Sequence, residues 1–228
     1  MKLLDLFCGA GGCSVGYARA GFEVVDVDVE PQPNYPYEFI QADALNVGED
    51  WWPLAEGQQE HREFDAIHAS PPCQAYSAVT PEQSNHPDLV AETRRLLRGT
   101  ALPYIIENVP GAPLEDPTTL CGSSFGLGVR RHRLFETNFT VMGPPCAHGQ
   151  MPAKYEVYEH GRWYKSPFAK VYGLGGGKAM EHWGEAMGIS WMTPKEMALA
   201  IPPAYCEHIG GYLRAHIEYQ KAVSSSLT

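Results

Sequence analysis

The sequence lacks any apolar run long enough to span a membrane, and it opens on a predicted strand instead of a secretory signal. Its 6 cysteines are scattered along the chain, with no CxxC pair among them. That distribution is typical of reduced thiols and not of a disulfide framework. We therefore expect a cytoplasmic protein with no membrane association.

Positive charge is also scarce. The chain holds 17 Lys and Arg against 27 Asp and Glu, which gives a formal net charge of −10. Phosphate contacts need basic side chains, so this balance counts against a nucleic-acid substrate unless the basic residues gather on one face. The 228 residues are enough for one sizeable domain, contain no internal repeat, and are expected to form a monomer.

What the sequence does contain begins with a glycine-rich turn. An apolar strand is predicted at residues 2–7, the turn at 8–14 and a helix at 15–21. This succession lets a ligand approach bare backbone at the start of a helix. It is a weak signal by itself, because turn glycines are common.

Acidic residues follow the next two predicted strands, at 22–28 and 39–44. An acid at such a strand end can accept hydrogen bonds from ribose hydroxyls, and Asp28 is the first choice, with Glu30 close behind. Asp43 is placed to meet an adenine edge. Together with the glycine turn, these acids favour an adenosine-bearing cofactor over ordinary turn glycines and solvated acids.

Cys73 is the candidate nucleophile. It follows a predicted buried strand at 64–69, which Pro71 and Pro72 end because proline has no N–H for a ladder. A cysteine on a stiff loop beyond the carboxyl end of a strand is placed to attack a ligand. In isolation Cys73 would instead be a small buried hydrophobe.

Glu107 and two arginines are further candidates. Glu107 directly follows a predicted strand at 103–106, and residues 126–137 run from a loop into another strand. Alternate residues of a strand share a face, so Arg131 and Arg133 are predicted to point the same way. Two guanidinium groups side by side suit an anionic or carbonyl-rich ligand. In isolation they would be ordinary surface arginines.

Residues 139–188 lose regular periodicity and form the expected irregular region. Cys146 and His148 are spaced as metal ligands are, but no second well-spaced pair follows them, so we predict no metal site. Aromatic and basic side chains interleave in the region, as on surfaces that stack on bases, at Tyr155, Tyr158, Trp163, Tyr164, Lys165 and Lys170.

Other segments complete the prediction. A polar surface loop or short helix is expected at 46–63, and a flexible glycine-rich segment at 171–178. A helix should begin after the capping residue Thr193, and a last helix should occupy 205–221.

The assembled order of motifs resembles the DNA cytosine-5 methyltransferase family, particularly its compact phage-type members. The resemblance covers residues 1–138 and 190–213 and is carried by Phe7–Gly12, Pro71–Gln74, Glu107–Val109, Arg131–Arg133, Thr193–Glu196 and Ile209–Gly211. Two positions depart from the family pattern: Val129 stands where the family has glutamine, and Gly211 where it has asparagine. The region at 139–188 is also much shorter than in typical members.

The resemblance implies a fold, a domain division and an activity. The fold would be α/β, a Rossmann-like S-adenosylmethionine-dependent methyltransferase fold with a doubly wound, mostly parallel sheet. Residues 1–138 and 189–228 would form the catalytic domain, and 139–188 a reduced target-recognition region. The activity would be methylation of carbon 5 of cytosine in DNA, with S-adenosylmethionine as the cofactor.

The resemblance also implies a role for each candidate residue. Catalysis would rest on a covalent bond from Cys73 to carbon 6, on Glu107 holding the base, and on Arg131 and Arg133. The arginines would hold the cytosine carbonyl oxygen or neighbouring backbone groups and lower the pKa of the thiol. The cofactor residues would be Phe7, Gly9, Ala10, Gly11, Gly12, Asp28, Glu30, Asp43, Ala44 and Pro71. The substrate residues would be Gln74, Ser77 and Asn108.

Two alternatives stay open at this stage. The acidic charge and the short recognition region are compatible with RNA, single-stranded DNA or a free cytosine nucleotide as the substrate, because a duplex requires the target base to be flipped out. A non-catalytic, methyltransferase-like binding partner is the second alternative, against which the presence of both Cys73 and Glu107 argues.

Overall fold

The computed structural model describes residues 1–37, 39–46, 64–172 and 180–226, so the segment expected at 46–63 and most of the glycine-rich segment lie outside the described residues. At the centre of this part is a seven-stranded sheet of order β3-β2-β1-β4-β5-β7-β6. Its strands are β1 (Lys2–Leu6), β2 (Glu23–Asp28), β3 (Phe39–Gln41), β4 (Ala66–Ala69), β5 (Tyr104–Asn108), β6 (Thr118–Leu120) and β7 (Arg133–Thr137).

The strands β1 to β5 run parallel, whereas β7 runs antiparallel to β5 and β6 antiparallel to β7. This is the predicted mostly parallel, doubly wound sheet. The helices are α1 (Gly12–Arg19), α2 (Val90–Gly99), α3 (Trp183–Met187), α4 (Pro194–Leu199) and α5 (Pro203–Ser226), with short 3-10 turns η1 (Gln83–Asn85), η2 (Gly122–Phe125) and η3 (His148–Gln150).

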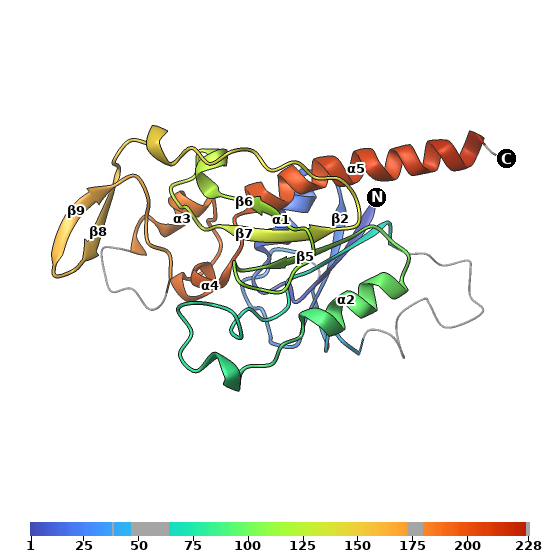
Figure 1. The fold of residues 1–228 in the computed structure, drawn as a ribbon, viewed down its shortest axis with the longest axis horizontal. Coiled ribbons are helices and arrows are strands. Elements are labelled where there is room, and N and C mark those ends of the chain that lie inside the picture. Colours follow the sequence, from blue (N-terminus) through green and yellow to red (C-terminus); the bar gives the residue numbers. More distant parts are fainter. Residues whose placement is uncertain (38, 47–63, 173–179, 227–228) are drawn as a thin grey trace.

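Helices cover both faces of the sheet (Figure 1). Successive residues of a strand point to opposite faces, and Leu3 accordingly packs with α1 and α5 while its neighbour Leu4 packs with α2. Ile105 and Ile106 of β5 divide in the same way. Both faces are therefore mostly apolar, which explains why these strands consist mainly of hydrophobic residues.

The close contact between α1 and α5 depends on two glycines. A Cβ atom on Gly12 would lie 2.2 Å from the carbonyl oxygen of Ile201, and one on Gly16 would lie 2.2 Å from that of Pro203. A side chain at Gly16 would force the two helices apart, and one at Gly12 would displace the residues that lead into α5. The glycine-rich motif thus serves helix packing as well as the turn before it, and α1 begins at Gly12, earlier than the predicted residue 15.

The predicted helix after Thr193 is confirmed in detail. The Thr193 hydroxyl accepts a hydrogen bond from the Glu196 backbone N–H, while the Glu196 carboxylate accepts one from the Thr193 N–H at 2.7 Å. This capping box satisfies two backbone donors at the start of α4.

The described parts of the region 139–188 contain more regular structure than their composition predicts. They contain the antiparallel hairpin of β8 (Tyr155–Glu159) and β9 (Arg162–Ser166), which lies at the end of the molecule opposite the C-terminus of α5 (Figure 1). Tyr155 and Val157 of the hairpin are buried in a hydrophobic cluster that also holds Trp183 of α3 and Met197 of α4. The hairpin is therefore attached to the C-terminal helices by an apolar core of its own.

A pair of buried acids lies beneath the glycine turn. Asp5 and Asp26 are each 0% exposed, and the Ser14 hydroxyl lies between them, 2.7 Å from an oxygen of each carboxyl group. One hydroxyl proton can be donated to only one of the two carboxyl groups, so the second contact requires a proton on the other. Burial raises the pKa of Asp5 well above its usual range, and that of Asp26 to about 7.

This pair predicts a pH-dependent stability. A raised pKa in the folded state adds stability below about pH 4, the usual aspartate range, and that contribution is lost as the pH rises towards about 7. We expect Asp26→Asn to gain stability relative to the wild type between pH 4 and pH 8, because asparagine cannot ionise. Urea unfolding across this range measures the difference. The exposed Glu156→Gln is the control, and a difference between Asp26→Asn and the wild type that does not change with pH would contradict the shared proton.

Among the described residues, no helix combines the length and the apolarity that crossing a bilayer requires.

Candidate active site

The candidate site residues converge at one edge of the sheet. The parallel strands β1, β2, β4 and β5 all end at this edge, and the antiparallel β7 begins there with Arg133. Strand β5 continues to Asn108, so Glu107 lies inside the strand and not after it as predicted. The register places Glu107 opposite Phe135, two residues from Arg133.

The loop that carries Cys73 is held by hydrogen bonds. The Cys73 carbonyl accepts bonds from the N–H groups of Tyr76 and Ser77, both at 3.0 Å. The Asn108 side chain donates a bond of 3.0 Å to the carbonyl of Pro71. Asn108, a candidate substrate residue, thus ties β5 to the loop that carries Cys73, and its Oδ1 also accepts a bond of 2.9 Å from the Val109 N–H.

Glu107 is buried, and one of its carboxylate oxygens accepts no hydrogen bond within the described residues. The residue is 5% exposed, and its Oε1 lies 3.1 Å from Nε of Arg133. This ion pair lacks hydrogen-bond alignment, and Oε1 has no hydrogen-bond partner within the described part of the chain. Burial raises the pKa of Glu107, opposed by the charges of Arg133 and Arg131 and by the Ser70 hydroxyl. A buried carboxylate oxygen that is ion-paired but accepts no hydrogen bond is suited to bind a polar ligand.

A buried chain of polar groups stands behind Glu107 and was not identified from the sequence. The Tyr17 hydroxyl lies 2.9 Å from Nδ1 of His68, and Nε2 of His68 lies 2.9 Å from the Ser70 hydroxyl. Burial lowers the pKa of His68 to about 3, so the imidazole is neutral. These two hydrogen bonds fix the orientation of the Ser70 side chain next to Glu107. A histidine in an otherwise apolar strand was the signal that could have indicated it.

The Cys73 side chain is partly exposed, and its thiol is an electrostatic neighbour of the acid and of both arginines. Burial raises the pKa of Cys73, and the charge of Glu107 raises it further, while Arg133 and Arg131 act in the opposite direction. The arginines therefore limit the shift but do not reverse it. The resting group is a thiol at neutral pH, and a bound ligand must change its surroundings before a thiolate predominates.

The prediction that Arg131 and Arg133 share one strand face is wrong. Strand β7 begins only at Arg133, and Arg131 precedes it with a φ of 33°. The Arg131 guanidinium donates to the carbonyl of Val171 at 2.9 Å and to that of Ala198 at 2.7 Å. Tyr205 supports this turn by donating to the Arg131 carbonyl at 2.8 Å. Arg131 thus ties the edge to the C-terminal part of the chain, and Arg133 is left as the partner of Glu107.

Two other predicted substrate residues, Gln74 and Ser77, lie on the loop that carries Cys73. Gln74 is partly buried, and its Oε1 has no hydrogen-bond partner in the described residues. The Ser77 carbonyl accepts a bond of 2.7 Å from the Gln83 side chain. An unpaired amide oxygen next to Cys73 is a second available acceptor at the site.

The glycine turn adopts a strained backbone that only a few residues tolerate. Phe7, Gly9 and Gly11 have φ values of 57°, 51° and 84°. Asp28 stabilises the turn, since its carboxylate accepts bonds from the N–H of Gly9 at 2.9 Å and that of Glu30 at 3.0 Å. A Cβ on Gly9 would meet no atom within 4 Å, so there is open space above the turn.

The C-terminal part of the chain completes this turn. The Trp191 indole donates a bond of 2.8 Å to the Ala10 carbonyl, and a Cβ on Gly11 would lie 2.6 Å from the Tyr35 ring. Trp191 and Tyr35 were not predicted from the sequence, because nothing local marks contacts between segments so far apart.

The remaining cofactor candidates occupy the ends of neighbouring strands. Asp43 is exposed and accepts bonds from the Leu45 N–H at 2.9 Å and from the Asn46 side chain at 3.0 Å. Ala44 and Pro71 are buried, whereas Glu30 is exposed. Bare backbone at the start of α1, with acids beyond two adjacent strands, fits an adenosine-bearing group.

Comparison with known proteins gives this geometry a context. A family model described as C-5 cytosine-specific DNA methylase matches residues 1–118. The chain is 35% identical over 85 residues to a type II methyltransferase, M1.HphI, of Haemophilus parahaemolyticus, and 32% identical over 84 residues to type II methyltransferase M.FnuDI of Fusobacterium nucleatum. Each match covers 34% of this chain, and the chain spans only 22% of the length of either relative.

Solved structures show the same fold over nearly the whole chain. The S. pombe Dnmt2 methyltransferase superposes with a TM-score of 0.58 at 13% identity, covering 93% of this chain and 98% of that one. The Entamoeba histolytica methyltransferase EhMeth gives a TM-score of 0.56 at 13% identity, covering 95% and 98%. At this identity the likeness concerns the fold alone.

Proposed function

The chain belongs to the C-5 cytosine-specific DNA methylase family, and on that premise we propose that it transfers a methyl group from S-adenosylmethionine to carbon 5 of cytosine in DNA. The observation that carries the proposal is the meeting of three groups at one sheet edge. They are the partly exposed Cys73 thiol, the buried Glu107 carboxyl group with an oxygen that accepts no hydrogen bond among the described residues, and Arg133, which is ion-paired with it.

The cofactor would lie over the glycine turn. Phe7 and residues 9–12 would line it, Asp28 or Glu30 would face the ribose, and Asp43 the adenine, with Ala44 and Pro71 completing the surface. The open space above Gly9 and the backbone N–H groups at the start of α1 support this placement. When bound, S-adenosylmethionine supplies a methyl group activated by its positively charged sulfonium sulfur.

The reaction would begin with Cys73. Carbon 5 of cytosine is a poor nucleophile until the ring loses its aromaticity. The partly exposed Cys73 thiol releases its proton to solvent, and its sulfur forms a bond to carbon 6 as the ring double bond opens, which moves electron density towards carbon 5 and N3. Because burial raises the pKa of Glu107, its carboxyl group holds a proton more readily and can deliver it to N3. Carbon 5 is then nucleophilic enough to accept the methyl group.

The reaction would end with elimination. Carbon 5 loses its proton to solvent, the bond between carbon 6 and the Cys73 sulfur breaks, and the electron pair restores the ring double bond as the thiolate leaves. The N3 proton returns to Glu107. Arg133 would hold the Glu107 carboxylate and the cytosine carbonyl throughout, and Arg131 would position this segment through its bonds to Val171 and Ala198.

The hairpin β8–β9 is the part of the structure best suited to contact the nucleic acid. Tyr158 and Trp163 are 56% and 53% exposed, and their ring centroids lie 5.3 Å apart. Exposed aromatic rings stack on unpaired bases, which would help to hold a strand from which one cytosine has been extruded.

Nucleoside mass spectrometry tests the proposal. Cells that express the chain are expected to accumulate 5-methylcytosine in DNA, while RNA and the free nucleotide pool from the same culture stay at background, because the family acts on DNA. Methylated cytosine confined to RNA or to nucleotides would move the proposal to that substrate. A folded protein that binds S-adenosylmethionine but modifies none of the three would contradict it.

A further inference from the structure

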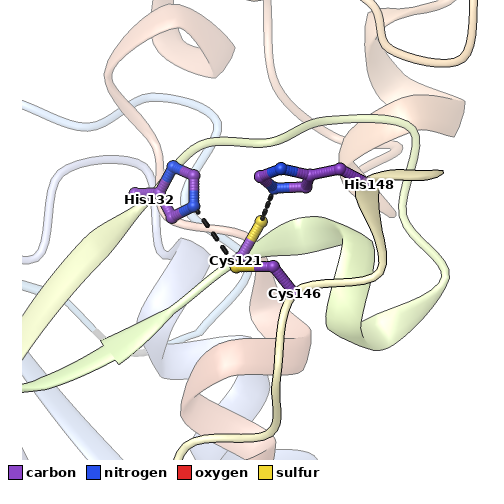
Figure 2. A group of neighbouring side chains, drawn as sticks. All are labelled: Cys121, His132, Cys146 and His148. Carbon is purple, nitrogen blue, oxygen red and sulfur yellow. Dashed lines mark hydrogen bonds between the residues drawn. The ribbon is translucent and has the colours of Figure 1, made fainter.

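A cluster of two cysteines and two histidines lies beside the catalytic edge, at the border between the sheet and residues 139–188. Its members are Cys121 before η2, His132 before β7, and Cys146 and His148 around the start of η3 (Figure 2). Their sulfur and ring nitrogen atoms all lie within 4.8 Å of one another. None of the four has a role in the proposed reaction.

The ligand atoms lie close to the separations that a single tetrahedral ion requires, and shifts of well under 1 Å in the short pair and about 1 Å in the widest would complete the geometry. Nε2 of His148 lies 3.1 Å from Sγ of Cys121, and Nε2 of His132 lies 3.4 Å from Sγ of Cys146. With bonds of about 2.3 Å to sulfur and about 2.0–2.1 Å to nitrogen, a tetrahedral zinc site has edges of about 3.3–3.8 Å between its ligand atoms. Figure 2 shows the four side chains pointing towards a common centre from three segments of the chain.

The segments that carry the ligands are held together by bonds that do not use the ligand atoms. The Ser123 hydroxyl accepts a bond of 3.0 Å from the Ala147 N–H, and the Ser124 hydroxyl donates one of 2.9 Å to the Pro145 carbonyl. The Gly122 N–H donates one of 2.8 Å to the Arg130 carbonyl. The four side chains are therefore brought together before any ion binds, which lowers the entropic cost of binding one.

The types of the four ligand side chains indicate which metal ion the site would bind. We propose that Cys121, His132, Cys146 and His148 form a closed Zn²⁺ site. Two thiolates and two imidazoles in a tetrahedron are typical of structural zinc, and two thiolates balance the charge of the ion. A two-iron cluster with the same residue types would place the cysteine pair and the histidine pair on different irons, which a spread of 4.8 Å does not allow.

A second group of two thiols and one imidazole lacks the features that favour metal binding at the proposed zinc site. Cys13, His68 and Cys206 are all buried and close together. Both ring nitrogens of His68 are already engaged, by the Tyr17 hydroxyl and by Ser70, and the group offers only three ligands. In the proposed zinc site, by contrast, each histidine directs a ring nitrogen at a sulfur.

The zinc ion would hold two segments of the protein together and would take no part in methyl transfer. Four protein ligands leave no open place for water, so the ion would be structural. His132 lies between Arg131 and Arg133 in the sequence, and Cys146 and His148 belong to the start of the irregular region. The ion would therefore fasten the segment that carries Arg133 to the region that leads into the hairpin. The proposed zinc site replaces the sequence prediction of no metal site. That prediction considered only ligands that follow His148 in the sequence, whereas Cys121 and His132 precede Cys146.

Metal analysis of the purified chain tests this inference. Protein expressed with zinc in the medium and passed over a weak chelating resin is expected to retain about one Zn²⁺ per chain. Cys146→Ala and His148→Ala should each retain less than about a tenth of that amount. Cys73→Ala and the exposed His86→Ala are the matched controls and should keep the wild-type content. Wild-type protein without zinc would overturn the site.

Two further measurements separate the alternatives and do not depend on how the variants fold. Metal-free wild-type protein should bind Co²⁺ with the visible absorption of a tetrahedral thiolate site and release it to Zn²⁺. Denatured metal-free protein should show all 6 cysteines as free thiols. Four thiols, with a disulfide between Cys121 and Cys146, would contradict a zinc site. Because none of these readouts needs methylation, the zinc site can fail without the proposed function, and the reverse also holds.

Discussion

Cys73→Ala is expected to abolish cytosine methylation while leaving the fold and cofactor binding intact. Without the sulfur no bond to carbon 6 can form, and carbon 5 remains aromatic and unreactive. Loss of an enzyme nucleophile lowers turnover by a factor on the order of 10⁶, so the product should fall to background. Transfer of a labelled methyl group from S-adenosylmethionine to unmethylated DNA measures the loss.

Two controls make this result interpretable. S-adenosylmethionine binding by calorimetry and the melting temperature should match those of the wild type, because the partly exposed Cys73 side chain contributes little packing. Cys73→Ser keeps the shape of the side chain but replaces the thiol by a far weaker nucleophile, and it should be equally inactive. Activity near the wild-type level in either variant would show that another group attacks the ring.

Glu107→Gln is expected to reduce turnover by about 10²–10⁴, the usual contribution of a positioned proton donor. Glutamine can still form hydrogen bonds, but it cannot carry the proton that N3 takes up. It also removes the partner of Arg133, with which Glu107 forms an ion pair of 3.1 Å. Single-turnover kinetics with saturating DNA measure the chemical step, and cofactor affinity should stay unchanged.

The chain offers a matched control for this variant. Glu136 is also buried in the sheet and paired with an arginine, since its Oε2 lies 2.7 Å from Arg94 of α2. It lies opposite Ile106, on the sheet face that α2 covers. Glu136→Gln should lower stability and leave single-turnover methylation unchanged. If both variants lost activity to the same degree, the effect of Glu107→Gln would be one of folding and not of catalysis.

The sheet could be predicted because each strand carries its own local signal. Apolar runs bounded by glycine or proline identified β1, β2, β4 and β5, and the residues beyond them had to share one edge. Cys73 and Glu107 were chosen as candidates in this way. The strand boundaries were predicted less accurately. Glu107 follows an apolar run and was placed after the strand, but it is paired with Phe135 inside the sheet.

Contacts between distant segments could not be predicted. Arg131 leaves the strand because of a turn supported by Tyr205, and its guanidinium meets carbonyl groups of Val171 and Ala198 that no local pattern connects with it. The zinc ligands show the same limit. Cys121 and His132 come from the sheet region and precede Cys146 in the chain, so only the folded arrangement brings the two pairs together.

Trapping the covalent adduct tests the central claim most directly. In DNA whose cytosines carry fluorine at carbon 5, methyl transfer can proceed but elimination cannot, because fluorine does not leave as a cation. With S-adenosylmethionine present, we predict a denaturation-resistant complex in which digestion and mass spectrometry locate the modified nucleotide on Cys73. A folded, cofactor-binding protein that forms no such complex, or that carries the nucleotide on another residue, would contradict the account.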